Sequence, residues 1–162
     1  MAKKNAQKWK ASLSAAENAR IVLPLLSRDY FSAGRKAVGD KLPADELHQF
    51  RLETKQFRYT LEMFQSCYPA GLDQRLAQLR QIQQYLGDIS DCLTARDLIR
   101  TIQPRRSRQA GAVRAFLDQR AAELAAKFRD YWTSTFDAPG RERNWTDYLT
   151  RFAGRGRMRS HL

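Results

Sequence analysis

Cysteine, glycine and proline are scarce in this 162-residue chain, which has 2 Cys, 8 Gly and 5 Pro. Two cysteines are too few for a disulfide framework, and together with the two histidines they show no metal-ligand spacing. We therefore expect Cys67 and Cys92 to be ordinary core thiols of a protein without a metal or another cofactor. The low glycine and proline content also argues against a β-sandwich with many turns.

Long hydrophobic runs are absent as well. The longest run, IVLPLL at 21–26, is far too short to cross a bilayer. The basic N-terminal segment MAKKNAQKWK is not followed by the apolar stretch and cleavage site of a signal peptide. These features predict a soluble cytoplasmic protein that does not insert into membranes.

Acidic residues are in deficit, because 17 Asp and Glu stand against 29 Lys and Arg, which gives a net charge of +12. Such an excess predicts a polyanionic partner, namely nucleic acid, an anionic membrane surface or a phosphate polymer. Hydrophobic residues make up 43% of the chain, which argues against wholesale disorder. The length is that of one domain with a single core.

The apolar residues recur with helical spacing, and no segment alternates as a strand would. We expect an all-α fold, an antiparallel four-helix bundle-like unit of long helices with a short extra C-terminal helix. Helices are predicted at 11–38 (two stretches, or one helix kinked at Pro24), about 44–67, 73–102, 107–136, and 144–152 with Asn144 as its cap. The domains are then a flexible basic arm at 1–10, a helical domain at 11–136, and a short helix with an Arg-rich tail at 137–162.

The segment LHQFRLETKQFRYTLEMF at 47–64 has two distinct faces when it is wound as a helix. One face is an ordinary core stripe of Phe50, Thr54, Phe57, Leu61 and Phe64. The opposite face carries a row of His48, Arg51, Lys55, Arg58 and Glu62, with Tyr59 beside it. In the first predicted helix the candidates for burial are Leu13, Ile21, Val22, Leu25, Leu26, Tyr30 and Phe31.

Two interpretations of the charged row are open. It can be a solvated face in which Arg58 and Glu62 form an ordinary i, i+4 pair. Alternatively, the row binds successive phosphates of an extended chain, with bidentate contacts from arginine, a point charge from lysine and a donated hydrogen bond from imidazole. His48 fits the second interpretation better, because it belongs neither to the core stripe nor to a typical Lys/Glu surface.

The following helix presents a second polar face with Arg80, Gln84, Gly87 and Asp91. A glycine inside a helix costs about 1 kcal/mol relative to alanine, and we expect Gly87 to mark the close approach of another element. Asp91 is a candidate for orienting an arginine or His48 of the preceding helix. The alternative is a solvent-exposed aspartate beside a packing glycine.

These two helices resemble the CHAD domain, the conserved histidine α-helical domain. Its first motif is matched by His48, Arg51, Lys55, Arg58 and Tyr59, and its second by Gln83, Leu86, Gly87 and Asp91, with Ile82 at a position usually held by leucine. The resemblance is specific over about 44–102, extends upstream into 18–37 and fades after Pro104.

The resemblance implies a helical bundle that binds inorganic polyphosphate in a basic groove without catalysing a reaction. The residues it places at the phosphate chain are His48, Arg51, Lys55 and Arg58, to which we add Tyr59, Arg80, Arg20, Arg35 and Lys36, with Gln84 and Asp91 as orienting residues. It also suggests association with polyphosphate granules. CHAD domains usually contain two such repeats, whereas this chain has one motif. We therefore expect a C2 homodimer with opposed basic faces, or else a monomer with an open half-groove.

Catalysis is not expected, because the sequence has no Gly-rich phosphate loop and no cluster of metal-binding side chains. Nucleic acid is the alternative partner. The clusters Arg105, Arg106 and Arg108, and Arg151, Arg155, Arg157 and Arg159, would bind any phosphate backbone. Trp132, Trp145 and Tyr148 are candidates for base stacking, although their helical spacing favours the core.

Overall fold

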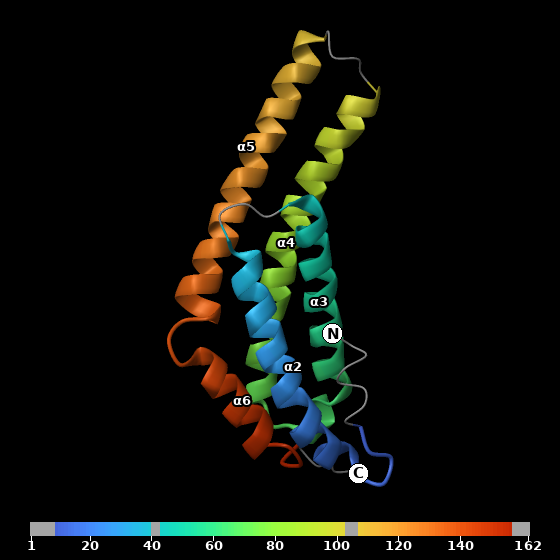
Figure 1. Ribbon diagram of the computed structural model, residues 1–162, viewed down its shortest axis with the longest axis vertical. Helices are drawn as coiled ribbons and strands as arrows, with labels where there is room; N and C mark the ends of the chain where they lie inside the picture. The colour runs from blue at the N-terminus through green and yellow to red at the C-terminus, as the bar shows by residue number, and fades with distance from the viewer. Residues whose placement is uncertain (1–8, 40–42, 103–106, 157–162) are drawn as a thin grey trace, which may run out of the picture.

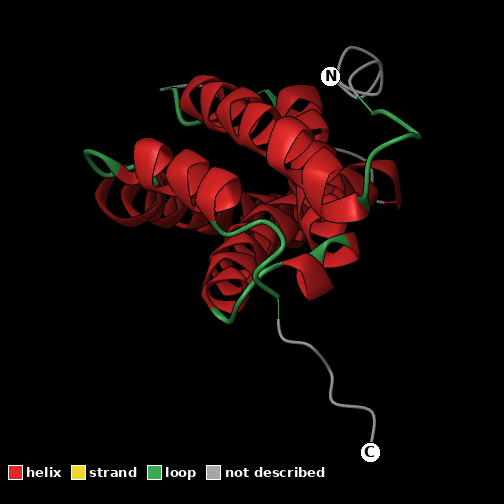
Figure 2. Ribbon diagram, turned by 90° about the horizontal axis from the view of Figure 1, so that it is seen from below, coloured by secondary structure: helices red, strands yellow, loops and turns green. Residues whose placement is uncertain are grey.

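Five α-helices make up most of the described part of the chain, which is residues 9–39, 43–102 and 107–156. In this computed structural model α2 spans Ala15–Ala37, α3 Ala44–Met63, α4 Gly71–Ile102, α5 Arg108–Tyr131 and α6 Arg141–Arg151. The described residues contain no strand, as Figure 2 shows, so the all-α prediction is confirmed. Most of the predicted arm, Arg105, Arg106 and the end of the arginine-rich tail lie outside the described residues.

Helix α2 continues through Pro24 as a single helix, which decides between the two alternatives that the sequence left open. It begins with a capping box, in which the Ser14 hydroxyl accepts a hydrogen bond from the Glu17 N–H and the Glu17 carboxylate accepts one from the Ser14 N–H. The expectation that Ile21 is buried was wrong, because its side chain is exposed and Leu23 occupies the core instead.

The C-terminal end of α3 lies at Met63 rather than near Cys67. Beyond it a short 3₁₀ turn, η1 (Gln65–Cys67), closes with hydrogen bonds from the Cys67 N–H to the Phe64 carbonyl and from the Tyr68 N–H to the Gln65 carbonyl. Bonds of this i, i+3 type tighten the end of a helix and satisfy its last carbonyl groups. Phe64 remains buried, so the core stripe extends past the end of α3.

Helix α5 ends at Tyr131 and passes into a π-helical turn, η2 (Trp132–Phe136), instead of running unchanged to Phe136. The Asp137 N–H donates to the Trp132 carbonyl at 2.7 Å, five residues back. Both Trp132 and Phe136 are buried. The Trp132 ring lies directly against Gly34 of α2, where a Cβ would overlap it.

The start of α6 also differs from the prediction. The helix begins at Arg141, after Gly140, whose φ of 83° lies in the left-handed region that favours glycine. Asn144 is therefore inside the helix and does not cap it. Its side-chain oxygen accepts a hydrogen bond from Nη2 of Arg75 on α4 at 2.7 Å, which ties α6 to the start of α4.

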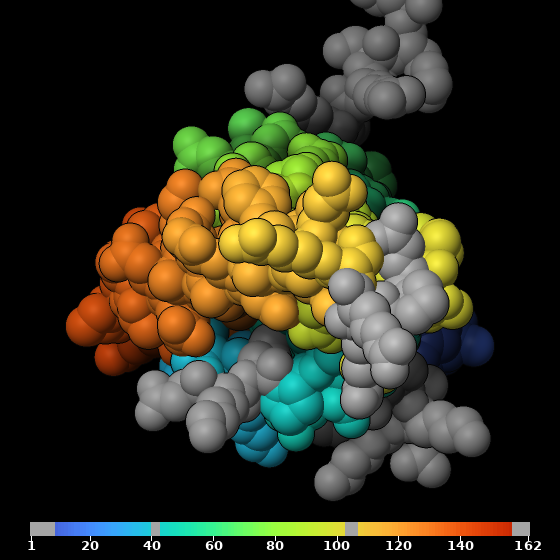
Figure 3. All heavy atoms as spheres, turned by 90° about the horizontal axis from the view of Figure 1, so that it is seen from above, coloured from blue at the N-terminus to red at the C-terminus, as the bar shows by residue number. Residues whose placement is uncertain are grey.

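The long helices pack in the order α2, α3, α4 and α5, and α6 lies against α2 (Figure 1). This arrangement confirms the predicted bundle-like unit with a short extra helix. Helices α4 and α5 project beyond α2 and α3 at one end of the bundle, and atoms of α5 and of the end of α4 dominate the view of that end in Figure 3. None of the described helices combines the length and apolar composition needed to cross a bilayer.

The core is rich in aromatic rings, and it determines which side of α3 faces outward. All five residues of the predicted α3 core stripe are buried. The Tyr30 ring of α2 stacks on Phe50 and Phe57 with centroids 5.4 and 4.8 Å away, and its hydroxyl group hydrogen-bonds with Thr54 at 3.0 Å. Because burying one such side chain stabilises the fold by about 1.5–3 kcal/mol, α3 cannot rotate without a large loss. Its cationic row is thereby held on the outside.

Candidate functional site

A groove of about 360 Å³ lies between α3 and α4. Helix α3 contributes Arg51 to its lining, and α4 contributes all the other lining residues, which are Arg80, Gln83, Gln84, Gly87, Asp88 and Asp91. The prediction that Arg80, Gln84, Gly87 and Asp91 share one face of α4 is therefore confirmed. That face meets the charged row of α3.

An ion pair fixes the register of the two helices. The carboxylate of Glu62 on α3 lies 3.0 Å from Nη2 of Arg80 on α4. Because α3 and α4 run antiparallel, moving eleven residues back along α3 from Glu62 and eleven forward along α4 from Arg80 brings Arg51 level with Asp91. The groove lining therefore runs from Arg80 at one end to Arg51 and Asp91 at the other, and Glu62 lies just outside it, bound to Arg80.

The cations of the α3 row differ in burial. His48 and Lys55 are exposed, whereas Arg51 and Arg58 are half-buried. The Arg58 guanidinium lies over the Tyr59 ring at 4.5 Å from its centroid, and the Lys55 ammonium lies 5.7 Å from the same centroid. Tyr59 itself is 45% exposed. The ring thus holds two cations beside each other on the outer side of α3.

Several polar atoms of α3 and α4, in the groove lining or outside it on the charged row, lack a hydrogen-bond partner. The Nε atoms of Arg51 and Arg58 and the Oε1 atom of Gln83 are buried without a hydrogen-bond partner in the protein. Buried polar atoms in native proteins nearly always have a partner, and a donor without one is costly. Of the two arginines, Arg51 lines the groove and Arg58 lies outside the lining. Because both Nε atoms are covered, an anion would meet the outer guanidinium nitrogens first, and these are suited to binding its oxygen atoms.

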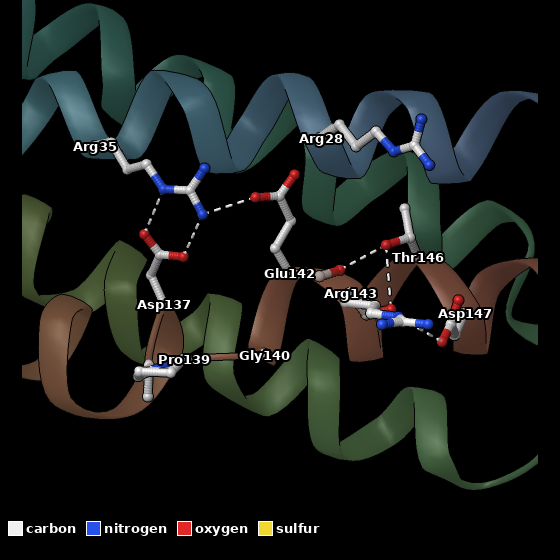
Figure 4. Close-up of a pocket in the computed structure, with 10 residues that line it drawn as sticks. Arg28, Arg35, Asp137, Pro139, Gly140, Glu142, Arg143, Thr146 and Asp147 are labelled. Carbon is white, nitrogen blue, oxygen red and sulfur yellow. Dashed lines mark hydrogen bonds and ion pairs between the residues drawn. The ribbon is translucent and has the colours of Figure 1, made fainter.

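The three basic residues predicted from α2 lie elsewhere. Arg35 binds Asp137 through Nε and Nη2 and Glu142 through Nη2, all at 2.7 Å, in the pocket of about 540 Å³ between α2 and α6 that Figure 4 shows. Hydrogen bonds to Asp137 and then to Glu142 raise the pKa of the Arg35 guanidinium. Arg20 donates to the Ala153 carbonyl at 3.2 Å, and Lys36 is exposed. The structure brings none of the three into the groove.

Comparison with known protein families gives a match. The model of the CHAD domain matches residues 2–100, more than half of the chain. The chain belongs to the CHAD domain family. This family is associated with polyphosphate binding. No curated protein and no solved structure matched the chain.

The CHAD match covers α2, α3 and all but the last two residues of α4. Both sides of the groove therefore belong to the family segment, and the resemblance inferred from the two motifs is confirmed. Helices α5 and α6 lie outside the match. Helix α5 packs on α4 and α6 packs on α2, so both support the CHAD segment from positions away from the groove.

The expectations for three residues of α4 need correction. A Cβ on Gly87 would meet no atom within 4 Å, so this glycine does not mark the close approach of another element and instead leaves the groove wall open. Asp91 shares the groove with Arg51 but makes no hydrogen bond or ion pair with it or with His48. Gln84 donates to Asp88 at 2.7 Å, so the carboxylate that it orients is Asp88.

The sequence placed Glu62 in the charged row and indicated Arg58 as its i, i+4 partner. In the structure its Oε1 atom accepts hydrogen bonds from both Arg58 at 2.8 Å and Arg80 at 3.0 Å. The contact with Arg80 depends on how α3 and α4 pack, and no pattern within one helix reveals it. Asp88 was missed as a groove residue for the same reason.

Other candidate chemistry receives less support from the described residues. No group of three or more His, Cys, Asp or Glu side chains among them is placed to hold a metal ion. Cys67 and Cys92 are free and half-buried. Trp132, Trp145 and Tyr148 are buried, so the prediction that they serve the core rather than base stacking is confirmed.

Proposed function

We propose that this chain binds inorganic polyphosphate along the groove between α3 and α4 without catalysing a reaction. Arg51, Arg58 and Arg80 would donate hydrogen bonds to phosphate oxygens, and Lys55 and His48 would extend the contact along α3. Tyr59 positions Lys55 and Arg58, while Gln84 and Asp91 shape the α4 wall. The proposal assigns no catalytic residue.

The observation that carries this proposal is the state of Arg51 and Arg58. Both guanidinium groups are half-buried at one edge of α3, and each has a buried Nε without a protein partner. Arg75 Nε and Arg114 Nη1 are in the same state outside the groove, so the feature that distinguishes Arg51 and Arg58 is that they share one row of cations along α3. Arginine donors held in place give directional contacts with phosphate oxygens, which a mobile charge does not.

An extended ligand fits the length of the row. From His48 to Arg58 the cations cover about 15 Å along α3, at 1.5 Å per residue. A single phosphate contacts only part of such a row, whereas a phosphate chain can contact all of it. Once one phosphate of the ligand is bound, the next phosphates of the same chain are held near their cations at a high effective concentration, so each contact strengthens the others.

Nucleic acid is the alternative, and exposed arginines favour it. Arg141 and Arg143 of α6 and Arg151 at its end are exposed far from the groove lining. These side chains would hold any phosphate backbone with salt-dependent affinity. The large aromatic residues near them are buried, which leaves no stacking platform there for single-stranded bases. If the groove is a site for a single phosphate chain, duplex DNA should compete poorly with polyphosphate for it.

Paired variants test this assignment. In a titration with long-chain polyphosphate at physiological salt, Arg51→Ala/Arg58→Ala should lose affinity by at least about tenfold, because two charge-assisted contacts disappear. The control Arg141→Ala/Arg143→Ala removes the same charge outside the groove and should lose less than about threefold. Arg51→Lys/Arg58→Lys keeps the charge and should fall between the two, since lysine cannot bind bidentately.

The same titration separates the alternatives. Equal losses in the two alanine variants, or complete displacement of polyphosphate by duplex DNA, would show that the chain is a general polyanion binder without a site at α3. Circular dichroism of each variant shows whether the overall helix content is retained.

We also propose that two chains assemble as a homodimer and that binding places the protein at polyphosphate granules. CHAD proteins usually carry two motif-containing repeats, whereas this chain has one. The outer side of α3 carries exposed apolar residues spaced seven and four apart, Leu52, Tyr59 and Met63, and Met63 is 79% exposed. Such a row beside the groove is a candidate contact for a second copy.

A further inference from the structure

Glu62 lies between two arginines that come from different helices. A single carboxylate oxygen, Oε1, accepts hydrogen bonds from Nη1 of Arg58 at 2.8 Å and from Nη2 of Arg80 at 3.0 Å. The Glu62 side chain is 28% exposed, so solvent reaches the contact and a ligand can too. Apart from packing, this carboxylate is the link between the cations of α3 and those of α4.

The Arg58 side chain is held on two sides. It is 14% exposed, its guanidinium lies over Tyr59, and one nitrogen is bound to Glu62. Its buried Nε has no protein partner. A carboxylate oxygen and a phosphate oxygen are both anionic, and both accept hydrogen bonds from a guanidinium group in similar geometry. Glu62 thus occupies the place that a phosphate oxygen would take between these two arginines.

We propose that Glu62 acts as an internal competing anion, and that it makes the groove select long phosphate chains over short phosphates. The proposal rests on the polyphosphate function proposed above. A short anion entering between Arg58 and Arg80 must displace the carboxylate or share donors with it at close range, where like charges repel. Its few contacts cannot offset that repulsion.

For a long phosphate chain, the balance between attraction to the cations and repulsion by Glu62 is different. The long chain contacts Arg51 and Lys55 as well, and those contacts form within one molecule, so they offset the repulsion at Glu62. The acidic residues further along the groove act in the same direction. Asp88 and Asp91 line it together with Arg51 and Arg80, so a short anion within the groove meets carboxylates as well as arginines. The exposed Lys55 and His48 outside this lining are within reach only of a longer ligand.

The Glu62→Gln substitution tests the effect of the negative charge of Glu62 on binding, separately from its hydrogen bonds. Glutamine keeps a carbonyl oxygen that can accept from Arg58 and Arg80, so it preserves the geometry while removing the negative charge. The control is Glu123→Gln on α5, which removes the carboxylate of a more exposed Arg–Glu pair, Arg120–Glu123 at 3.5 Å, outside the groove. Both variants raise the net charge by one.

The test is calorimetric titration of wild type and both variants with tripolyphosphate and with long-chain polyphosphate at physiological salt. Glu62→Gln should strengthen tripolyphosphate binding by about fivefold and long-chain binding by less, which lowers the ratio of the two affinities. Glu123→Gln should leave that ratio unchanged. Thermal unfolding without ligand shows whether either change affects the fold.

The outcomes distinguish this inference from the function on which it rests. If wild type binds neither ligand, the polyphosphate function fails and the inference falls with it. If wild type binds long chains but Glu62→Gln leaves the ratio unchanged, or weakens both ligands equally, the function stands and Glu62 is only a structural link between α3 and α4.

Discussion

At the scale of single residues, burial distinguishes the members of the cationic row. Lys55 and His48 are exposed and contribute charge, while Arg51 and Arg58 are half-buried and contribute directed donors. Exposed charges act on any polyanion and are screened by salt. We therefore expect the arginines to determine which anion is bound, and Lys55 and His48 to affect mainly the overall strength of binding.

Gly87 allows stability and binding to be separated at one position. Because a Cβ there meets no atom within 4 Å, Gly87→Ala should stabilise the fold by about 1 kcal/mol through the helix propensity of alanine. The added methyl group lies at the groove wall and should weaken polyphosphate binding. Urea denaturation and titration of the same variant measure the two effects.

The control for this prediction is Gly34→Ala. Its Cβ would overlap the Trp132 ring, and overpacking of this kind costs about 1–3 kcal/mol or more. A loss of stability in Gly87→Ala comparable to that in Gly34→Ala would mean that the space beside Gly87 is filled.

At the scale of elements, Arg35 links α2 to α6. It binds Asp137 before α6 and Glu142 in the first turn of α6, and those bonds raise its pKa. A base whose folded pKa is raised contributes stability at every pH below its unfolded pKa and loses it only as the pH rises beyond that value. The stability that the charged Arg35 contributes to this contact is therefore constant across the neutral pH range.

Arg35→Gln should lower the free energy of unfolding by about 1 kcal/mol, a modest value because the side chain is 49% exposed and solvent weakens the pairs. Polyphosphate affinity should change less than about twofold, since Arg35 is outside the groove. Thermal unfolding and titration check both parts. A large loss of polyphosphate affinity with unchanged stability would show that Arg35 belongs to the binding site.

Local patterns predicted the helices and the two faces of α3, because burial of one face repeats with the helical period. The core stripe from Phe50 to Phe64 and the opposite row from His48 to Arg58 both follow from that period. The Glu62–Arg80 and Arg35–Asp137 contacts join residues 18 and 102 positions apart in sequence. Such contacts depend on packing between helices, which periodicity within one helix does not specify.

Helix ends were predicted less well for related reasons. Asn144 is a typical capping residue, but the left-handed Gly140 starts α6 earlier. In the π turn the Trp132 ring packs against Gly34 of another helix, a contact that the local sequence does not show. Gly87 was misinterpreted because a helical glycine is compatible with a tight contact and with an open groove, and only the neighbouring helix distinguishes them.

At the scale of the whole molecule, buried tyrosines make stability sensitive to high pH. Desolvation raises the pKa of Tyr30 and Tyr68 well above the usual value of about 10. The folded state then keeps protons that the unfolded state releases, so stability is complete below pH about 10 and falls as the pH rises above it. Each such tyrosine contributes a slope of up to about 1.4 kcal/mol per pH unit.

Denaturant unfolding between pH 8 and 11 measures this effect. Tyr68→Phe should be less stable than wild type at pH 8, because the hydrogen bond from Tyr68 to the Leu149 carbonyl at 2.8 Å is lost. It should also lose stability less steeply above pH 10. Parallel curves for the two proteins in that range would contradict the assignment to Tyr68.

The assembly state is a second property of the whole molecule. Gel filtration with light scattering should show a dimer, and Met63→Glu should shift it toward monomer by placing a charge on the exposed side of α3. Ser134→Glu, an exposed change in η2, is the control. A wild-type protein that is monomeric both with and without polyphosphate would contradict the homodimer proposal.

The central claim is that a phosphate chain binds to Arg51 in the α3–α4 groove and to Arg58 outside its lining on the same row, and NMR of arginine Nε–H groups tests it most directly. Added polyphosphate should shift the Nε–H signals of Arg51 and Arg58, whose Nε atoms lack protein partners, and leave Arg35 unshifted because its Nε is bound to Asp137. Shifts confined to exposed arginines such as Arg141 and Arg143 would contradict the account.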